Sequence, residues 1–431
     1  MRHALRLPSL SRLLTVLVVA VVVTALIPAA PASAKTVKID KRLFGLHDGD
    51  PRDPSWPAVS PGSIRLWDSG VSWAELEPSQ GAVDWSRLDA IVAAANARGA
   101  EVTLVLGQTP AWADDPALDG VGPQYMPRMD AWKNHVAAVA SRYKGRIKAY
   151  QVWNEANIVN YWAQNRHNTP FGMARLTDAA YGTIKSIDPS ALVVGPAFAT
   201  RLSWQRTYLR TFFGSRVSGV PVWKRMDAIS LNLYPTADGT PESSLKLLKA
   251  ARASMALRGV PASKPIWNSE INYGLATGGS GASTGIPASK QASYVVRTYL
   301  LNAAQKVKRV HWYMWDRPEI GSTKMVAADR TTPTLAGRAF GLVQGWMLGG
   351  KLVGPTRSSL PCTKDKAGTY TCVIKYRGGV KRVYWNPNKR VKIRTAKSAT
   401  FTVNIYGKQT KVRGGSTKKV NYQPIMVRSK F

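Results

Sequence analysis

Cysteine, histidine and acidic residues are scarce in this chain of 431 residues. It has 2 cysteines, 5 histidines and 25 acidic residues, against 60 lysines and arginines, so its formal net charge is +35. No two histidines have the His-x-x-x-His spacing of a metal site, and the cysteine pair lacks zinc-ligand spacing. A Gly-x-Ser-x-Gly nucleophile elbow is also missing. These absences disfavour zinc and serine-hydrolase chemistry, and we expect neither a metal nor a cofactor.

Long apolar runs are also rare, and the one that occurs lies near the N-terminus. It extends from Leu13 to about Ile27, after several basic residues and before the small residues Ala32-Ser33-Ala34. This pattern predicts a signal peptide over residues 1–34, cleaved after Ala34. An uncleaved anchor is the alternative, but the run is shorter than the ~20 residues of a spanning helix. We therefore expect a secreted, extracellular protein without a membrane span after signal removal.

The two cysteines, Cys362 and Cys372, both lie in the last hundred residues. An exported protein enters an oxidising environment, in which this pair can form a disulfide. The intervening residues read as strand, turn and strand, with the turn at residues 366–368. A disulfide would therefore staple a hairpin, and free thiols are the alternative.

The last part of the chain is strongly basic. From Lys351 to Phe431 it has 20 lysines and arginines and one acid, Asp365, which gives a formal charge of +19. It also contains β-prone apolar runs separated by turn residues, which a disordered basic arm would lack. We predict a small basic β-sandwich-like domain over residues 350–431.

Residues 35–349 alternate strand and helix patterns. Eight strands are predicted at Leu43–His47, Ser63–Trp67, Val102–Gly107, Ala149–Asn154, Leu192–Pro196, Ala228–Tyr234, Pro265–Glu270 and Arg309–Asp316. Helices are predicted at Asp84–Arg98, Met129–Lys144, Phe171–Ile187, Trp204–Phe213, Glu242–Arg258, Ala288–Ala304 and Thr334–Trp346. This alternation predicts an α/β fold, a (β/α)8 TIM barrel. An open doubly wound sheet is the main alternative, but no glycine-rich phosphate loop follows the first strand.

Two carboxylates end strands of this predicted barrel. Glu155 follows the fourth strand in Trp153-Asn154-Glu155, and Glu270 ends the seventh in Asn268-Ser269-Glu270. Active sites of such barrels lie at the carboxyl ends of the strands. Glycosidic bond cleavage uses two carboxyl groups that face each other, one as an acid and the other as a nucleophile or base.

Several phrases resemble the clan A glycoside hydrolases, retaining enzymes with an acid/base after Asn on strand four and a nucleophile on strand seven. Within the clan, the chain is most similar to family 39-like secreted bacterial enzymes. The phrases are Phe44-Gly45-Leu46-His47, Arg65-Leu66-Trp67-Asp68-Ser69-Gly70, Trp73-Ala74-Glu75-Leu76-Glu77-Pro78, Gln108-Thr109-Pro110-Ala111-Trp112, Trp153-Asn154-Glu155-Ala156-Asn157 and Asn232-Leu233-Tyr234-Pro235. The resemblance covers about residues 43–347. The usual proline after the acid/base is Ala156 here.

The resemblance implies a role for each of five residues. Glu155 would be the acid/base, with a pKa raised by burial and by the charge of Glu270. Glu270 would be the nucleophile and would stay ionised. Asn154 would bind the sugar 2-hydroxyl, Tyr234 would donate a hydrogen bond to Glu270, and Arg65 would hold that group anionic.

Aromatic residues are the second group of candidate substrate ligands. The chain has 15 tryptophans, and aromatic rings match the apolar faces of sugars. The resemblance implies that Trp315 or Trp312 forms a floor under the sugar, and Trp112 lies in a predicted rim loop. Ordinary packing is the alternative for each tryptophan. His47 could bind a substrate hydroxyl, and a buried structural role is its alternative.

We therefore expect a secreted retaining O-glycoside hydrolase that acts on a poly- or oligosaccharide by double displacement. The alternative is a non-catalytic barrel that binds carbohydrate or an anionic surface. The basic C-terminal domain could retain the protein on an acidic glycan or the cell envelope. We expect no specific nucleic acid partner, because export and the lack of a recognition motif disfavour it.

Overall fold

The computed structural model describes Met1 and residues 36–114, 120–163, 165, 168–275, 285–354 and 361–430. The predicted signal peptide and its cleavage site lie outside these residues, apart from Met1. Residues from Ala34 to Phe431 form one compact unit. Within the described ranges, no helix combines the length and the apolar character needed to cross a membrane.

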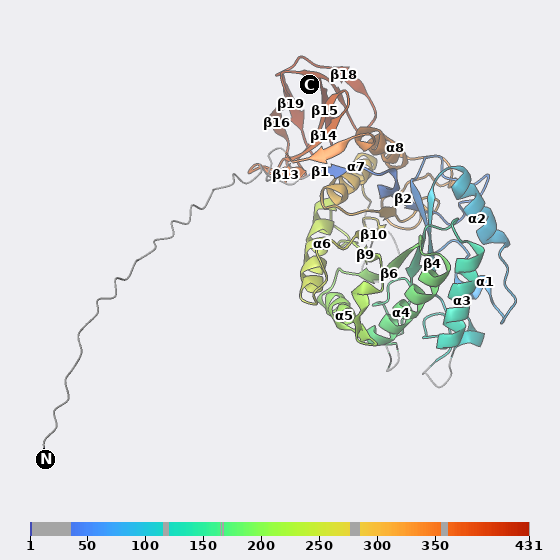
Figure 1. Ribbon diagram of the computed structural model, residues 1–431. Coiled ribbons are helices and arrows are strands. Elements are labelled where there is room, and N and C mark those ends of the chain that lie inside the picture. Colours follow the sequence, from blue (N-terminus) through green and yellow to red (C-terminus); the bar gives the residue numbers. More distant parts are fainter. Residues whose placement is uncertain are drawn as a thin grey trace. The chain divides into compact units, whose positions relative to one another are not determined.

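Eight parallel strands close into a barrel, in the spatial order β10-β11-β2-β3-β4-β5-β6-β9 (Figure 1). They are β2 (Phe44–His47), β3 (Ser63–Leu66), β4 (Glu101–Leu106), β5 (Ala149–Val152), β6 (Leu192–Ala199), β9 (Ala228–Asn232), β10 (Ile266–Ile271) and β11 (Val310–Trp312). Almost every residue in them is buried, because a parallel strand of a barrel is covered on both faces. The predicted (β/α)8 barrel is therefore confirmed.

Helices surround the barrel (Figure 1). They are α1 (Trp73–Leu76), α2 (Ser86–Ala97), α3 (Met129–Arg142), α4 (Pro170–Ile187), α5 (Ser203–Gly214), α6 (Pro241–Ala256), α7 (Ala288–Ala304) and α8 (Leu335–Met347). Thr169 caps α4 by accepting a hydrogen bond from the amide of Gly172, and Pro170 occupies its first turn. Gly99 and Gly145, with φ of +61° and +73°, follow α2 and α3, where a left-handed residue ends a helix. Two short strands, β7 (Arg216–Val217) and β8 (Val220–Pro221), pair after α5.

On one side of the barrel, four neighbouring strands begin with an apolar cluster. Ala149, Val194, Ala228 and Trp267 come from four neighbouring strands, near the strand starts, and form an apolar cluster. Polar side chains occupy positions further along the strands, towards their carboxyl ends. Packing at the amino ends of the strands therefore supports a polar site at the opposite rim.

The C-terminal domain is an antiparallel sheet of order β1-β12-β14-β15-β20-β17-β18, with β13 paired to β14. Its strands are β1 (Thr36–Lys38), β12 (Lys351–Val353), β13 (Cys362–Lys364), β14 (Tyr370–Tyr376), β15 (Gly379–Trp385), β17 (Ala399–Val403), β18 (Gln409–Lys411) and β20 (Ile425–Ser429). A ribbon of β16 (Val391–Arg394) and β19 (Thr417–Val420) packs on it through an apolar cluster that includes Tyr384, Val420 and Val427. These two layers resemble the predicted β-sandwich-like arrangement. One boundary differs, because β1 precedes the barrel in sequence but belongs to this sheet.

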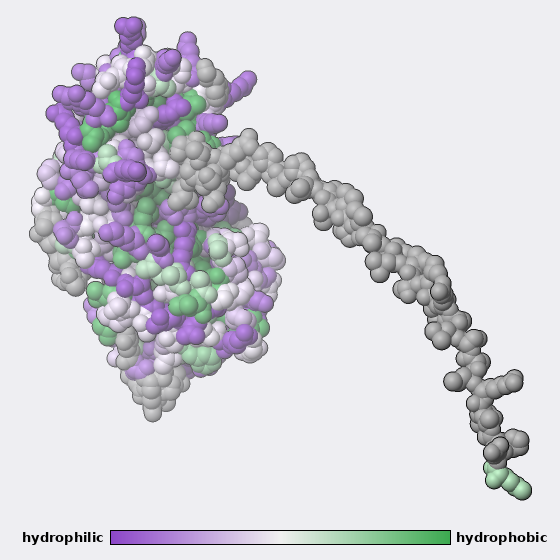
Figure 2. Space-filling view, turned by 90° about the vertical axis from the view of Figure 1, so that its left-hand side faces the viewer, coloured by the Kyte–Doolittle hydropathy of each residue, from purple (hydrophilic) through white to green (hydrophobic). Residues whose placement is uncertain are grey.

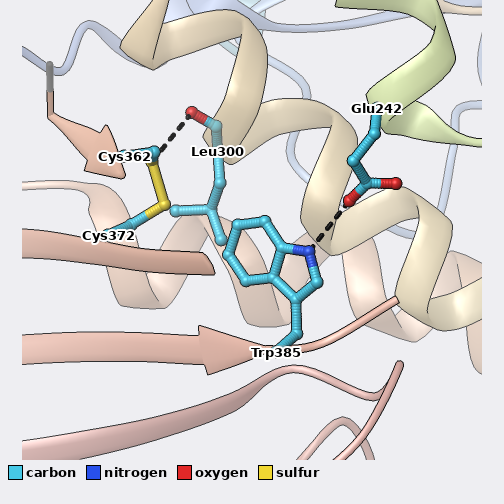
Figure 3. The surroundings of a disulfide bond; sticks show 5 residues. All are labelled: Glu242, Leu300, Cys362, Cys372 and Trp385. Atoms are coloured by element: carbon cyan, nitrogen blue, oxygen red, sulfur yellow. Dashed lines mark hydrogen bonds between the residues drawn. A yellow bond between two sulfur atoms is a disulfide. The ribbon is translucent and has the colours of Figure 1, made fainter. Parts of the chain in front are cut away.

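A disulfide joins Cys362 of β13 to Cys372 of β14, which are direct partners in the strand register (Figure 3). The Cys362 sulfur also lies 3.8 Å from the carbonyl oxygen of Leu300 in α7. The hairpin that the cysteine spacing predicted is thus closed by the bond and rests against the barrel.

The C-terminal domain packs on the barrel through polar contacts. Trp385 of β15 donates a hydrogen bond of 2.8 Å from Nε1 to Glu242 Oε1 on α6 (Figure 3). Glu242 is also ion-paired with the buried Arg297 of α7. On the other side, Lys381 Nζ donates to the carbonyl oxygen of Gly345 at 3.0 Å. Removal of the domain would leave these barrel groups without their partners.

Candidate active site

The two predicted catalytic carboxylates lie at the same rim of the barrel. Glu270 lies near the end of β10, in register with Asn232 at the end of β9, and Glu155 is the third residue after β5. Trp153 and Glu155 have left-handed φ values of +63° and +38°. Such a conformation is costly for a residue with a side chain and occurs preferentially at functional sites. It turns the chain sharply after β5 and presents Glu155 at the rim.

Glu270 is buried and held by two donors. Its exposed fraction is 5%. Arg65 Nη1 donates to Oε1 at 2.7 Å, and Tyr234 Oη donates to Oε2 at 3.2 Å. The contacts that the sequence predicted for Arg65 and Tyr234 are therefore present in the structure. Both donors favour the anionic form of Glu270.

Arg65 connects three strands through its guanidinium. It is fully buried and also donates from Nε to Gln151 Oε1 at 2.6 Å and from Nη2 to Asn154 Oδ1 at 2.8 Å. A planar guanidinium has five N–H groups in fixed directions, so these contacts fix its orientation. Arg65 thus holds Asn154, which precedes the candidate acid/base, and Glu270 in one network.

Glu155 has a different environment. It is half-buried, and Asn232 Nδ2 donates to its Oε1 at 3.0 Å. The amide of Asn232 is oriented by Ser269, whose hydroxyl donates to Oδ1 at 2.7 Å. Among the described residues, Glu155 has no ion-pair partner within 4.0 Å. A carboxyl without a paired cation is the better proton carrier of the two.

Both carboxyls have a pKa above the ordinary glutamate range, and the larger rise belongs to Glu270. Burial raises the pKa of Glu155, and the Asn232 hydrogen bond and the charges of Arg65 and Arg201 oppose that rise. Burial also raises the pKa of Glu270, to about 8, with Arg65 opposing and the charges of Glu155 and Asp68 adding to it. Two interacting carboxyls titrate as a pair. We place the proton that the pair retains on Glu155, because Arg65 and Tyr234 both donate to Glu270.

Three groups at the rim were not predicted as site residues. Tyr313, just after β11, lies edge-on to His47 and donates a hydrogen bond of 2.5 Å to Asp68, just after β3. Tyr161 follows β5, and burial, with the charges of Glu155 and Glu270, raises its pKa. Asp68 had a sequence signal, because it follows a strand directly. The two tyrosines lie in loops whose course the sequence does not reveal.

His47 lies behind Arg65 in the structure. Its exposed fraction is 1%, and its Nε2 lies 2.9 Å from the carbonyl oxygen of Ser269 and 3.0 Å from Arg65 Nη1. Burial, with the charge of Arg65, lowers its pKa well below the usual range, so the ring is neutral. This geometry matches the structural alternative, and the direct contact with a substrate hydroxyl is not supported.

The predicted tryptophan floor needs correction. Trp312 is fully buried and packs among Tyr273 and Tyr299, so its ring faces the helices and away from the barrel interior. The physical reason is the alternation of side chains along a strand, which directs every second residue outwards. Trp315 has an exposed fraction of 2% and offers a sugar no accessible face in this structure.

Trp112 is half-buried in the rim loop after β4. Its Nε1 donates to the carbonyl oxygen of Glu77 at 2.8 Å, and its ring packs edge-on against Trp73. These contacts explain its position through loop packing. Tyr313 is an aromatic residue after β11 whose surroundings include Glu270 and Asp68.

Comparison with known proteins agrees with this barrel. Residues 68–201 match the model of glycosyl hydrolase family 10, a stretch that includes Glu155 and ends before Glu270. Endo-1,4-beta-xylanase 1 of Gibberella zeae is 25% identical over 202 residues, which cover 44% of this chain and 52% of the xylanase. The chain thus spans about half the length of this curated relative.

Solved structures match over most of the chain. A family 39 glycoside hydrolase from Bacteroides cellulosilyticus WH2 has a TM-score of 0.66 at 16% identity, covering 91% of this chain and 82% of that one. A family 39 beta-xylosidase from Caulobacter crescentus has a TM-score of 0.62 at 13% identity, covering 93% and 98%. At these identities the likeness shows the fold alone. Together with the family-model match and the xylanase similarity, it relates this chain to the clan A glycoside hydrolases.

Proposed function

We propose that this protein is a secreted retaining glycoside hydrolase that cleaves O-glycosidic bonds of a poly- or oligosaccharide. One observation carries the proposal: a half-buried carboxyl, Glu155, and a buried one, Glu270, lie at the same barrel rim, and among the described residues only Glu270 is paired with a cation. This asymmetry suits an acid and a nucleophile, which need opposite protonation states at the same pH. A barrel that only binds carbohydrate would not need it.

In the first step, Glu155 donates its proton to the glycosidic oxygen while Glu270 attacks the anomeric carbon. The bond to the leaving sugar breaks, and a glycosyl ester on Glu270 forms. Arg65 and Tyr234 keep Glu270 ionised and oriented before the attack. Loss of the Glu270 charge lowers the pKa of Glu155, so its carboxylate is ready for the next step.

In the second step, the Glu155 carboxylate takes a proton from water, and the water oxygen attacks the anomeric carbon. The ester bond to Glu270 breaks, and both carboxyls return to their starting states. This mechanism requires the two carboxyl groups to lie about 5–5.5 Å apart, whereas a separation of about 6.5–9.5 Å would favour inversion.

Xylan is the first substrate to test, because the curated relatives are endo-1,4-beta-xylanases. The experiment is digestion of a glycan library that includes xylan, with product analysis by mass and NMR of the anomer released first. A retained anomer, together with a glycosyl adduct on the peptide that contains Glu270, is the expected result. An inverted anomer, or no cleavage of any glycan, would contradict the proposal.

Secretion is part of the proposal. The apolar N-terminal run with its small-residue cleavage site supports it, as does the disulfide, which is a bond typical of oxidising compartments. The test is N-terminal sequencing of the protein from the culture medium. The expected first residue is Lys35, and retention of the full chain in the cell would contradict the proposal.

The partner of the basic C-terminal domain is proposed to be an acidic glycan of the substrate or of the cell envelope. Figure 2 shows hydrophilic side chains projecting from this domain. Lys392 and Lys419 are exposed and directly opposite each other in the β16–β19 ribbon, and Arg394 is exposed on the same strand. Like charges in opposite positions destabilise a ribbon, and a polyanion would relieve this repulsion.

This partner proposal is tested by binding of the whole protein to an acidic polysaccharide at increasing salt. Truncation near Gly349 is not suitable, because the domain packs on α6 and contains β1. The replacement Lys392→Gln/Lys419→Gln is preferable, with Lys246→Gln/Lys249→Gln on α6 as its control. Weaker, salt-sensitive binding of the first variant alone is expected. Equal binding of both variants would contradict the proposal.

A further inference from the structure

Arg201 lies beside the candidate acid/base and is not used by the proposed mechanism. It follows β6, the strand next to β5, whose end carries Glu155. Ala199 at the end of β6 is in register with Asn232, which donates to Glu155. Arg201 and Glu155 influence each other electrostatically, which agrees with this placement.

The guanidinium of Arg201 is only partly engaged by the protein. It is half-buried, and its Nε donates to the carbonyl oxygen of Tyr234 at 3.3 Å. Within the described ranges, neither of its terminal nitrogens has a hydrogen-bond partner, and no carboxylate lies within 4.0 Å. Other buried arginines of the barrel, such as Arg65 and Arg309, each have an ion pair. Arg201 therefore has unused donors at the rim.

Several carboxyls lie on the opposite side of the rim, with Arg317 among them. In the barrel order, β6 lies diametrically across from β2. Asp48 follows β2, Asp68 follows β3, and Asp316 follows β11, so three carboxyls gather around β2. The charges of Asp316 and Asp50, with burial, raise the pKa of Asp48. The site thus has a cation on the side of Glu155 and carboxyls on the other side.

We propose that Arg201 binds the carboxylate of a uronic acid on the leaving-group side of the cleaved bond. This inference rests on the proposed function, because Glu155 must face the leaving-group oxygen. A guanidinium with two free nitrogens can bind a carboxylate in bidentate fashion.

The experiment compares glucuronic-acid-substituted xylan with the same xylan after chemical reduction of its carboxyls. kcat/KM is measured for the wild type, Arg201→Gln, Arg201→Lys and Arg210→Gln. Arg210 is a matched control, because it lies on α5 and its guanidinium contacts Thr207. A charge-assisted contact predicts a wild-type preference of about 10- to 100-fold for the acidic xylan.

In Arg201→Gln, the ratio of kcat/KM on acidic xylan to kcat/KM on reduced xylan should fall towards one. Arg201→Lys should keep part of the wild-type ratio, and Arg210→Gln should keep all of it. A wild type without preference, or an equal loss of rate on both xylans in Arg201→Gln, would overturn the inference. Binding of acidic xylo-oligosaccharide by the Glu270→Gln protein is measured in parallel by calorimetry. Arg201-dependent binding by Glu270→Gln, combined with no hydrolysis by the wild type, would refute the proposed function alone, and binding independent of Arg201 would refute this inference.

Discussion

The barrel and the C-terminal domain carry their charges in different ways. In the barrel, buried arginines are paired: Arg65 with Glu270 at 2.7 Å and Arg309 with Glu101 at 3.0 Å. The C-terminal part has 20 basic residues and a single acidic one. Two of the basic residues, Lys392 and Lys419, are exposed and lie opposite each other.

Buried and exposed charges act by different rules. A buried ion pair is little screened and depends on precise geometry, so each partner is costly to remove. Exposed charges are screened beyond about 8 Å at physiological salt, and each contributes little. The barrel therefore suits chemistry at a fixed point, and the basic domain suits weak, additive attraction to a polymer.

Glu270→Gln is expected to have the largest effect, because it removes the proposed nucleophile. Activity should fall by at least about 10⁴-fold, as expected when a covalent catalyst is lost. The glutamine oxygen can still accept from Arg65, so the fold should persist by circular dichroism. Glu319→Gln, which alters an exposed surface pair with Arg330, is the control. Substantial activity in Glu270→Gln would rule out its nucleophilic role.

Glu155→Gln should come next. Loss of a general acid costs about 10²- to 10⁴-fold, and substrates with poor leaving groups depend on it most. Natural glycans should therefore be affected strongly, and activated aryl glycosides much less in the first step. Steady-state and burst kinetics on both substrate kinds measure this. An equal loss on both would argue against Glu155 as the acid.

A pair of arginine substitutions separates site function from stability within the barrel. Arg65→Met leaves the buried Glu270 without a cation, which costs about 3–5 kcal/mol of unfolding free energy. Arg309→Met leaves the buried Glu101 with Arg42 as its remaining partner, so a smaller loss is expected. Chemical denaturation should show both losses. Activity per folded molecule should fall only in Arg65→Met, because Glu101 is remote from the rim. A similar loss of specific activity in both variants would mean that Arg65 is only a structural pair.

The pH dependence follows from the raised pKa values of the pair. Folded protein retains a proton that the unfolded chain releases in the ordinary carboxyl range, so stability falls as pH rises above that range. Glu155→Gln should flatten this fall. The alkaline limb of kcat/KM should also lie above the ordinary carboxyl range, because burial raises the pKa of Glu155. A limb near the ordinary glutamate value would contradict this assignment.

The smallest effect is expected in the basic ribbon. Lys392→Glu replaces a like-charge pair with an opposite-charge pair across from Lys419, which should stabilise the protein by about 0.2–1 kcal/mol. The same change should weaken binding to an acidic glycan. Lys392→Gln removes the charge without adding an anion. Its stability and its binding to acidic glycan should lie between those of the wild type and Lys392→Glu. Thermal unfolding measures the stability, and salt elution from an acidic column measures the binding. Tighter binding by Lys392→Glu would refute the attraction of the basic domain to an acidic polymer.

The sequence by itself was sufficient for the architecture. Apolar runs bounded by turn and cap residues predicted all eight barrel strands within a few residues, because a strand buried on both faces must be apolar. The phrases around Glu155 and Glu270 located both carboxylates, since each follows or ends such a strand. The contact of Tyr234 with Glu270 was implied by the family resemblance, and the structure contains it.

Tertiary structure decided which side chains share the site. Tyr313, Tyr161 and Arg201 come from loops whose course depends on packing, and the local sequence around them has no distinguishing pattern. Trp312 was misplaced because a shift of one residue along a strand exchanges the barrel interior for the helix layer. His47 is covered by Arg65, which comes from the neighbouring strand. Which polar side chains are covered in this way is determined only when the barrel closes. Local sequence thus specified the elements, and long-range packing specified what they expose.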